Sequence, residues 1–361
     1  MPAIKKPSEH FDAKARTGAG GASVTVTGVN FQPDLVWTKS RNQAYDHMLA
    51  DSVRGTTKAL RSNLAAVELT ADSWGYLNAF NSNGYTAVPG SANFNSYGTS
   101  SVTYIDWMWK AGGTAVTNTD GTISSQVSAN QTAGFSIVAW TGNGSASATV
   151  GHGLGAVPAM IICKERTGTD SWHIKHKSMA TTVNGYFNGQ NNIYTAAQVG
   201  DGMLGDLSSN TTFGFVTAGS PGNVVAVNEN GITNIAYCWS EIDGYSKFGT
   251  YTGDGSTDGP FVYLGFKPKF IMVKVLSGST GNWTIYDGGR NTYNFTDSYI
   301  TASLTDQQFN GGASYPGVDF LSNGFKIRTG SGSTVGTDIN NSSTIAYAAF
   351  AETPLKYASA R

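Results

Sequence analysis

The sequence is poor in charge. Charged residues make up 13% of the 361 residues, about half the usual share, and the formal net charge is −1. No basic run extends beyond Lys5-Lys6. A protein that neutralises several phosphates needs clustered lysines and arginines, so the sequence predicts no nucleic-acid partner.

Long apolar runs are also lacking. No apolar stretch reaches the ~18 residues that a membrane-spanning helix needs, and the N-terminal segment MPAIKKPSEHFDAKA has no apolar signal-peptide core. We therefore expect no membrane insertion, and synthesis in a cytoplasm without export by the general secretory route.

Cysteine and histidine are scarce. Cys163 and Cys238 both lie in apolar, strand-like runs, so we interpret them as buried reduced thiols, with a disulfide between them left open. Two cysteines alone cannot form a zinc site. His173 and His176 share a strand-like segment but would point to opposite faces, which favours surface or turn residues over a metal pair. The remaining histidines are His10, His47 and His152.

The acidic residues that could serve catalysis are scattered singly rather than in the pairs typical of glycosidases. They are Asp51, Asp106, Glu241, Asp254, Asp287 and Glu352. Asp254 and Asp258 resemble a calcium loop only loosely, and a turn is the simpler interpretation. No G-x-S-x-G elbow occurs. We predict no catalytic residues, no metal site, no cofactor and no enzymatic activity.

Glycine and aromatic residues are abundant. The 45 glycines and the 12% of aromatic residues, together with many threonines, serines and asparagines, indicate short strands joined by tight turns. Little helix is expected, and the best candidate covers residues 53–66.

A threefold internal repeat is the strongest signal. Three segments begin with a phenylalanine, pass through a Thr-Gly turn and a strand, and reach a proline before a second strand that ends in lysine. The phenylalanines are Phe11, Phe135 and Phe248, the prolines Pro33, Pro158 and Pro268, and the lysines Lys39, Lys164 and Lys274.

Further markers recur in the same order. An aromatic-led strand begins at Tyr45, Trp172 and Trp283, and a closing strand aligns at Ile105, Ile235 and Ile345. The first and third copies share FNSNGYTAV and FLSNGFKIR, whose Asn-Gly pairs predict hairpins, and the second keeps a degraded version near Phe213–Phe215. Asp51 in the first copy and Asp287 in the third occupy matching places, and the second copy has His176 there. We attribute this match to a shared structural turn.

The sequence thus predicts an all-β protein of three tandem β-sandwich modules, jelly-roll or concanavalin-like. We place an N-terminal arm at 1–10, module one with a connecting hairpin at 11–133, module two at 134–245 and module three at 246–361. Seven aromatic residues could stack against sugars if exposed, although burial is the interpretation we favour. They are Trp37, Tyr45, Trp140, Trp172, Tyr251, Trp283 and Tyr286. The binding residues are otherwise unknown.

Four segments carry a resemblance to a repeat of tail-associated and other virion proteins of tailed bacteriophages. They are FSIVAWTGNGS, GFKPKFIMVK, IAYCWSEIDGYSKFGTYTG and AETPLKYASAR. Module one departs from the pattern, because its turn reads RTGAGG and Met108 stands where module two has Cys238. The resemblance implies concanavalin-like sandwiches in a virion component.

From this resemblance we expect a virion protein, a tail fibre or adhesin with lectin-like receptor binding. The alternatives are a capsid decoration or head-fibre protein without glycan binding, and, ranked last, a polysaccharide depolymerase. The expected partners are other virion proteins, a host-surface glycan and further copies of the chain in a homo-oligomer, a trimer. We expect residues 1–10 to be ordered only by a partner.

Overall fold

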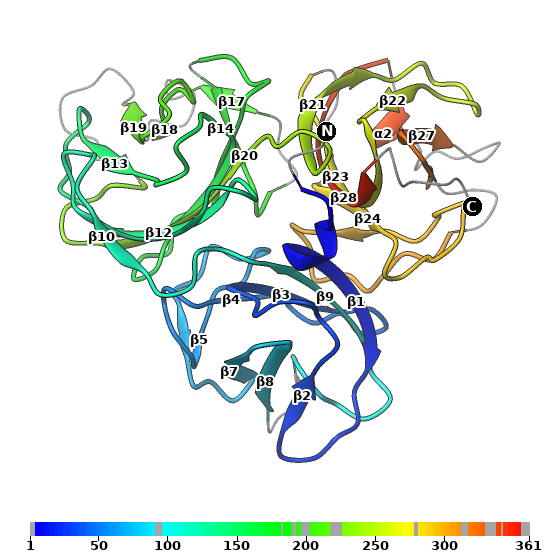
Figure 1. Cartoon of the computed structure of the whole chain (residues 1–361), viewed down its shortest axis with the longest axis horizontal. Helices are drawn as coiled ribbons and strands as arrows, with labels where there is room; N and C mark the ends of the chain where they lie inside the picture. Colours follow the sequence, from blue (N-terminus) through cyan, green and yellow to red (C-terminus); the bar gives the residue numbers. More distant parts are fainter. Residues whose placement is uncertain are drawn as a thin grey trace.

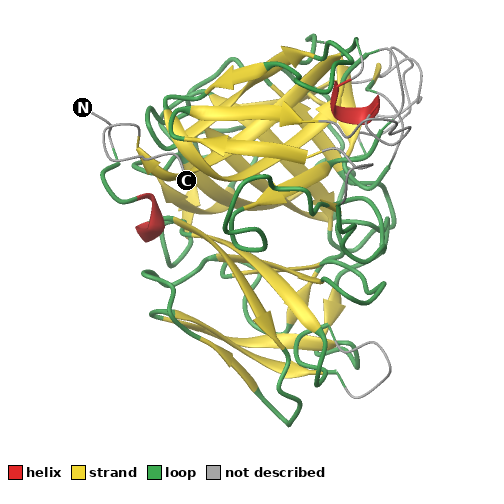
Figure 2. Cartoon of the chain, turned by 90° about the vertical axis from the view of Figure 1, so that its right-hand side faces the viewer, coloured by secondary structure: helices red, strands yellow, loops and turns green. Residues whose placement is uncertain are grey.

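The chain folds into three β modules arranged around a common centre, as a computed structural model of the whole chain shows (Figure 1). Strands dominate, and the short helical turns lie at the periphery (Figure 2). The structure describes residues 4–90, 96–181, 183–189, 193–195, 203–216, 226–277, 281–311, 317–328, 337–340 and 342–354. Within these ranges, no helix is long and apolar enough to cross a bilayer.

Module one follows the 3-10 turn η1 (Pro7–Glu9) and contains two facing antiparallel sheets, ordered β1-β9-β3-β4 and β2-β8-β7, with the short pair β5-β6 beside them. The strands are β1 (Phe11–Thr17), β2 (Val24–Val26), β3 (Leu35–Ser40), β4 (Met48–Asp51), β5 (Lys58–Ala59), β6 (Leu69–Thr70), β7 (Gly75–Asn81), β8 (Gly84–Pro89) and β9 (Thr103–Trp109). The helix expected at 53–66 is therefore wrong, because turns and β5 occupy that segment.

Module two repeats this plan with a larger sheet ordered β10-β11-β12-β20-β14-β15-β16-β17 and a smaller sheet ordered β13-β19-β18. The strands are β10 (Val116–Asn118), β11 (Ser125–Asn130), β12 (Phe135–Thr141), β13 (Thr149–Gly151), β14 (Pro158–Glu165), β15 (His173–His176), β16 (Val183–Tyr186), β17 (Tyr194–Thr195), β18 (Met203–Leu204), β19 (Thr212–Val216) and β20 (Thr233–Ser240). The predicted connecting hairpin is β10-β11, and it joins the sheet of module two rather than module one.

Module three has sheets ordered β21-β28-β23-β24-β25 and β22-β27-β26. The elements are β21 (Ser246–Thr252), β22 (Phe261–Tyr263), β23 (Phe266–Val275), β24 (Thr284–Asp287), β25 (Ile300–Thr301), β26 (Gly317–Leu321), β27 (Gly324–Arg328), α2 (Thr337–Asn340) and β28 (Thr344–Pro354). Both Asn-Gly hairpins form as predicted, with Asn81 opposite Gly84 and Leu321 opposite Gly324. A side chain at Gly84 or Gly324 would collide with a carbonyl oxygen of the neighbouring strand.

The central strand of each large sheet is buried on both faces. Along β3, for example, Leu35 and Trp37 face a core shared by the three modules, whereas Val36 faces the core between the two sheets of module one. The same alternation holds for β14 and β23. This double burial explains why these strands are continuously apolar instead of alternating with polar residues.

The shared core lies where the three large sheets meet, and the small sheets lie outside it (Figure 1). Trp109, Trp239 and Phe350 occupy the same register position opposite β3, β14 and β23. Their rings form a triangle with centroid separations of 5.9, 5.6 and 6.5 Å. Corresponding residues therefore meet around a pseudo-threefold axis within one chain.

The strand register corrects one alignment made from the sequence. Ile105 and Ile235 face Lys39 and Lys164, but the residue facing Lys274 is Ala346, one position after Ile345. Ile345 is buried as expected, yet it points into the core of module three rather than the shared core. The three opening phenylalanines do lie in corresponding strands, β1, β12 and β21, although Phe248 is the third residue of its strand.

The N-terminal arm is also corrected. Ile4 is 3% exposed and belongs to the shared core, and Pro7 in η1 is buried. Ile4 and Pro7 therefore pack against their own chain, which contradicts the expectation that the arm contacts only a partner. Residues 1–3, like the C-terminal end of AETPLKYASAR, lie outside the described residues.

The first prediction tests the shared core. Ile235 is fully buried, so Ile235→Ala should lower the free energy of unfolding by about 2–5 kcal/mol through lost burial and a cavity. Urea denaturation would measure the loss. Val116→Ala is the control, since Val116 is 65% exposed, and equal effects of the two substitutions would contradict the assignment.

Candidate functional site

Six of the seven aromatic residues considered as sugar platforms are buried inside the cores. They are Trp37, Trp140, Trp172, Tyr251, Trp283 and Tyr286. Only Tyr45 is partly exposed. The favoured interpretation, burial, is correct for these six, and they do not form an exposed sugar-binding surface.

Three corresponding side chains instead connect the modules. Asp51, His176 and Asp287 pair with the same position of β3, β14 and β23. Each makes one hydrogen bond to the next module around the ring that the three modules form. Tyr237 Oη of module two donates to Asp51 (2.8 Å), and His176 Nε2 lies 3.1 Å from Tyr347 O of module three. Trp107 Nε1 of module one donates to Asp287 (3.0 Å).

A second set of three side chains links each module to its neighbour in the opposite direction around the ring of modules. His47, Trp172 and Trp283 occupy one position, two residues before Leu49, Ile174 and Ile285. Each contacts a backbone carbonyl of another module: His47 Nε2 with Thr301 O (3.1 Å), Trp172 Nε1 with Arg61 O (2.8 Å) and Trp283 Nε1 with Tyr186 O (3.2 Å). The residue of module one that corresponds to the tryptophans is thus His47, not Tyr45.

The shared turn predicted for these positions is present. Asp51 and Asp287 each form a fully buried ion pair with an arginine three residues later, Arg54 and Arg290. In module two, His176 Nδ1 accepts a hydrogen bond from the Ser178 amide, as Asp51 does from backbone amides. Sequence reasoning found the turn but missed its second role, the contact with the neighbouring module.

His173 and His176 are buried, which corrects the expectation of a surface position, although His176 does begin a turn. His173 Nδ1 lies 2.8 Å from the Tyr194 hydroxyl inside module two, within hydrogen-bond distance. Burial lowers the pKa of His173 and of His176 to about 4. Burial, reinforced by the nearby Lys39 ammonium, also holds the pKa of His47 well below its usual value.

The six acidic residues considered for catalysis are each held by a cation or a backbone amide. Asp106 pairs with Arg16, Glu241 with Lys177 and Glu352 with Lys267; Asp254 accepts from the Ser256 amide, a turn as predicted. No cluster of three potential metal ligands occurs among the described residues. Cys163 and Cys238 are free, buried thiols, as predicted.

The repeated lysines end the central strands by binding backbone carbonyls. Lys39, Lys164 and Lys274 are all buried. The Lys39 ammonium donates to the carbonyls of Ser40, Gln43 and, in module three, Thr305. Lys164 and Lys274 bind carbonyls of their own loops. The recurring lysine is therefore structural.

Exposed aromatic side chains distinguish module three. Among the described residues, the aromatic side chains more than a third exposed are Phe261, Tyr263, Tyr293 and Phe295, all in this module. Tyr293 is the most exposed, at 74%. It lies in a loop that modules one and two lack in this form, because nine residues separate Arg290 from Ile300, whereas five separate Arg54 from Leu60.

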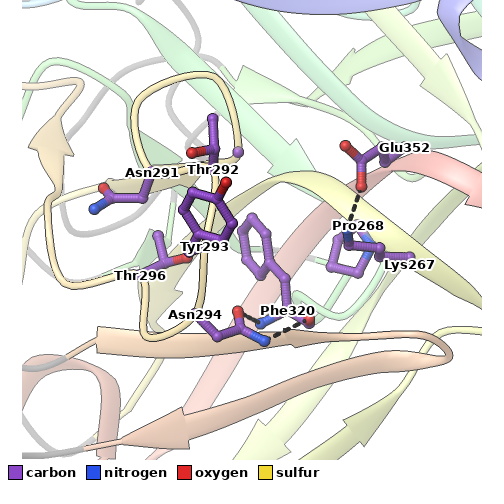
Figure 3. Close-up of a pocket in the computed structure, with 10 residues that line it drawn as sticks. Lys267, Pro268, Asn291, Thr292, Tyr293, Asn294, Thr296, Phe320 and Glu352 are labelled. Atoms are coloured by element: carbon purple, nitrogen blue, oxygen red, sulfur yellow. Dashed lines mark hydrogen bonds and ion pairs between the residues drawn. The ribbon is translucent and has the colours of Figure 1, made fainter. Parts of the chain in front are cut away.

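Tyr293 lines a shallow pocket between this loop and the place where β23 begins beside the end of β28 (Figure 3). The pocket holds about 20 Å³, room for about one water. Its other lining residues are mostly polar: Lys267, Pro268, Gly288, Asn291, Thr292, Asn294, Thr296, Phe320 and Glu352.

The pocket is rigidly supported. The Asn294 side chain binds both the amide and the carbonyl of Phe320, and Thr296 pairs with Val318 in both directions. On the opposite wall, Lys267 and Glu352 form an ion pair at 2.6 Å. An exposed ring therefore stands beside fixed amide, hydroxyl, ammonium and carboxylate groups, an arrangement that can bind a polar ligand with one apolar face.

A wider depression of about 670 Å³ lies between modules one and two. Its lining includes His10, Asp34, Lys110, Asn130 and Gln131. The Asp34 carboxylate is held by the Ser52 hydroxyl and the Ala111 amide, and burial raises its pKa. None of these described lining residues carries a strongly exposed aromatic side chain, so the module-three pocket is the better candidate.

Comparison with known proteins identifies the family. A model described as a domain of unknown function (DUF7483) matches residues 6–354, which include all three modules. The chain belongs to the DUF7483 family. No curated protein and no solved structure shows significant similarity to it. The family model thus describes the three-module ring as one unit rather than a single module.

The second prediction concerns the buried turn of this DUF7483 chain in which Asp287 pairs with Arg290 and also accepts the hydrogen bond from Trp107. Asp287→Asn should destabilise it by about 3–5 kcal/mol, because the fully buried Arg290 would lose its charged partner. Thermal and urea unfolding would measure this loss, with the turn substitution Asp254→Asn as control. A loss no greater than the control's would show that the buried Asp287–Arg290 pair does not stabilise the fold.

Proposed function

We propose that this DUF7483 chain is a component of a tailed-bacteriophage virion, a tail-associated adhesin that binds a host-surface glycan. The four sequence segments that resemble phage virion repeats support the virion part of the proposal. The observation that supports glycan binding is the ring of Tyr293, 74% exposed beside polar side chains in a loop particular to module three.

The chemistry of the pocket suits a sugar. A pyranose has an apolar C–H face and a rim of hydroxyl groups. Tyr293 offers a flat apolar surface for the first, and Thr292 and Glu352 offer hydrogen-bonding groups for the second (Figure 3). A loop on a rigid sheet is a common place for such recognition.

The ring formed by the three modules suits a role in a virus particle. Three modules, which we propose to be jelly-roll or concanavalin-like, share one core, so the pocket is presented on a rigid body. The ring also bears on assembly: the contacts that a homotrimer of single modules would make are already supplied within one chain. Self-association into a trimer stays a prediction, and it would have to use other surfaces.

The third prediction tests the glycan site. Tyr293→Ala should weaken binding of the purified protein to host-envelope glycans about fivefold or more, because the stacking of a nucleobase on an aromatic ring, taken as a guide to the stacking of a sugar, contributes on the order of 1–3 kcal/mol. Binding would be measured by surface plasmon resonance on immobilised glycans. Tyr263→Ala is the matched control, since Tyr263 is 53% exposed on β22 and does not line the pocket.

Equal binding by the two variants and the parent protein would reject this site. Localisation on the particle separates the adhesin from the alternative of a capsid decoration or head-fibre protein. Immunogold labelling at the tail supports the proposal, and labelling over the capsid shell would replace it with that alternative.

The fourth prediction separates binding from hydrolysis. Incubation with host polysaccharide should produce no sustained release of reducing ends, because the acidic residues considered for acid–base chemistry are held singly by cations or backbone amides. A reducing-end assay over many protein equivalents measures this. Continuous release above the level of a heat-denatured sample would instead favour a depolymerase.

A further inference from the structure

We propose that β22, an outer strand of module three, joins two copies of the chain by pairing with the same strand of a second copy. The inference goes beyond the proposed function and does not depend on glycan binding. β22 is an end strand of the small sheet β22-β27-β26 and lies on the outer side of its module (Figure 1). It carries two of the exposed aromatic side chains of module three, Phe261 at 45% and Tyr263 at 53%.

One edge of β22 is open. Val262 is paired with Phe325 of β27, and the flanking hydrogen bonds, two residues to either side of Val262, also run to β27. In an antiparallel ladder, alternate residues bond to the neighbouring strand. Phe261 and Tyr263 therefore direct their N–H and C=O groups away from β27. The one hydrogen bond that reaches these groups from the described residues is donated by the Lys247 ammonium to the Tyr263 carbonyl (3.2 Å).

The same edge is covered in module two. Val150 of β13 corresponds to Val262, because each is paired with an aromatic residue of the next strand of its small sheet. The segment before β11 lies along β13, where Ile123 forms a bridge with Val150 and its amide donates to Thr149 O (3.0 Å). The Thr149 amide donates to Thr122 Oγ1 (2.9 Å). An additional extended segment therefore fits on this edge of the small sheet.

Module one has the same edge without the aromatic residues. Thr25 and Thr27 stand where module three has Phe261 and Tyr263. Small polar side chains add little to strand pairing, whereas aromatic side chains opposite each other stabilise it. Within the described part of the chain, the open aromatic edge thus occurs in module three alone. A contact between two identical edges closes as a pair and does not propagate.

The free groups of β22 are complementary to themselves. When two β22 strands run antiparallel about a twofold axis at Val262, Phe261 of one copy lies opposite Tyr263 of the other. Both residues direct N–H and C=O groups across the gap, so each Phe261–Tyr263 pair exchanges two hydrogen bonds. The rings of each pair meet on the outer face, because Val262 between them points into the core. The Tyr263 carbonyl has two lone pairs, so its contact with Lys247 leaves room for this bond.

The charges at the two ends of β22 fit the same arrangement. The Lys247 ammonium lies at the Tyr263 end, 5.2 Å from the centre of the ring, and forms no ion pair with the described residues. At the other end, the side chain of Asp258 is 68% exposed although it binds Lys326 and Arg328. Antiparallel pairing sets the Lys247 end of one copy toward the Asp258 end of the other. The formal net charge of −1 adds little repulsion between copies.

Sedimentation velocity of the full chain over a range of concentrations tests the proposal, and the parent should pass from monomer to dimer. Phe261→Thr/Tyr263→Thr copies the corresponding residues of module one and keeps good strand formers at both positions. It should raise the dimer dissociation constant about tenfold, because both aromatic pairs are lost. Val116→Thr, which removes an exposed apolar side chain from β10, is the matched control and should leave the constant unchanged.

A mixed disulfide tests the register. Phe261→Cys in one preparation and Tyr263→Cys in another should cross-link when they are mixed with oxidised glutathione, because the Cα atoms of such a pair lie about 5.5 Å apart. Each variant alone should cross-link much more slowly, since its cysteine faces an aromatic ring of the other copy. The native thiols are buried and burial raises their pKa, so they should not react.

A parent chain that stays monomeric at its highest soluble concentration overturns the proposal and leaves the edge to a different partner. Association that persists unchanged in Phe261→Thr/Tyr263→Thr also overturns it, as does cross-linking that is as fast in either cysteine variant alone as in the mixture. If the double variant does not fold, the cross-linking comparison decides. Glycan binding measured below the dimer dissociation constant does not involve this pairing, so the two proposals fail independently.

Discussion

The shared aromatic core is the interaction on which the rest of the structure depends. Each large sheet has two apolar faces, one covered by the small sheet of its own module and one covered only by the other two modules. A single module would leave the second face in water, including side chains as large as Trp107, Trp109 and Trp239. The ring therefore closes because that area has no other partner, and the hydrogen bonds fix the angles at which it closes.

Closure around an axis limits how far the three copies can stay identical. Ser62, Phe187 and Ala302 occupy one position, two residues after Leu60, Gly185 and Ile300. Only Phe187 is large; it touches Trp37, Trp172 and Trp283, while Ser62 donates to Ala302 O. Three phenylalanines at this position would collide, so one module carries the large side chain and the other two carry small ones.

The same compensation explains what the sequence could and could not predict. Repeats, hairpins and the lysine-terminated strands are local patterns, so their strands and turns were correctly predicted. The cross-module partners were not predicted, because within a pair of neighbouring positions the large and the small side chain change places from one module to another. His47 beside Trp37 corresponds to Trp172 beside Ile162, and Phe248 opposite Ala348 corresponds to Ala13 opposite Trp107. Charge scarcity also concealed the buried ion pairs of Asp51 and Asp287, whose arginines look like ordinary turn residues in the sequence.

The candidate site was hidden for a different reason. Aromatic residues that recur mark the core, so a search among repeated aromatic residues leads to buried ones such as Trp172 and Trp283. Tyr293 lies in a segment that does not repeat, and the signal that could have found it is the longer spacing between Arg290 and Ile300. In a ring of similar modules, positions that follow the repeat are constrained by the shared core, and positions that depart from it are free to acquire a ligand.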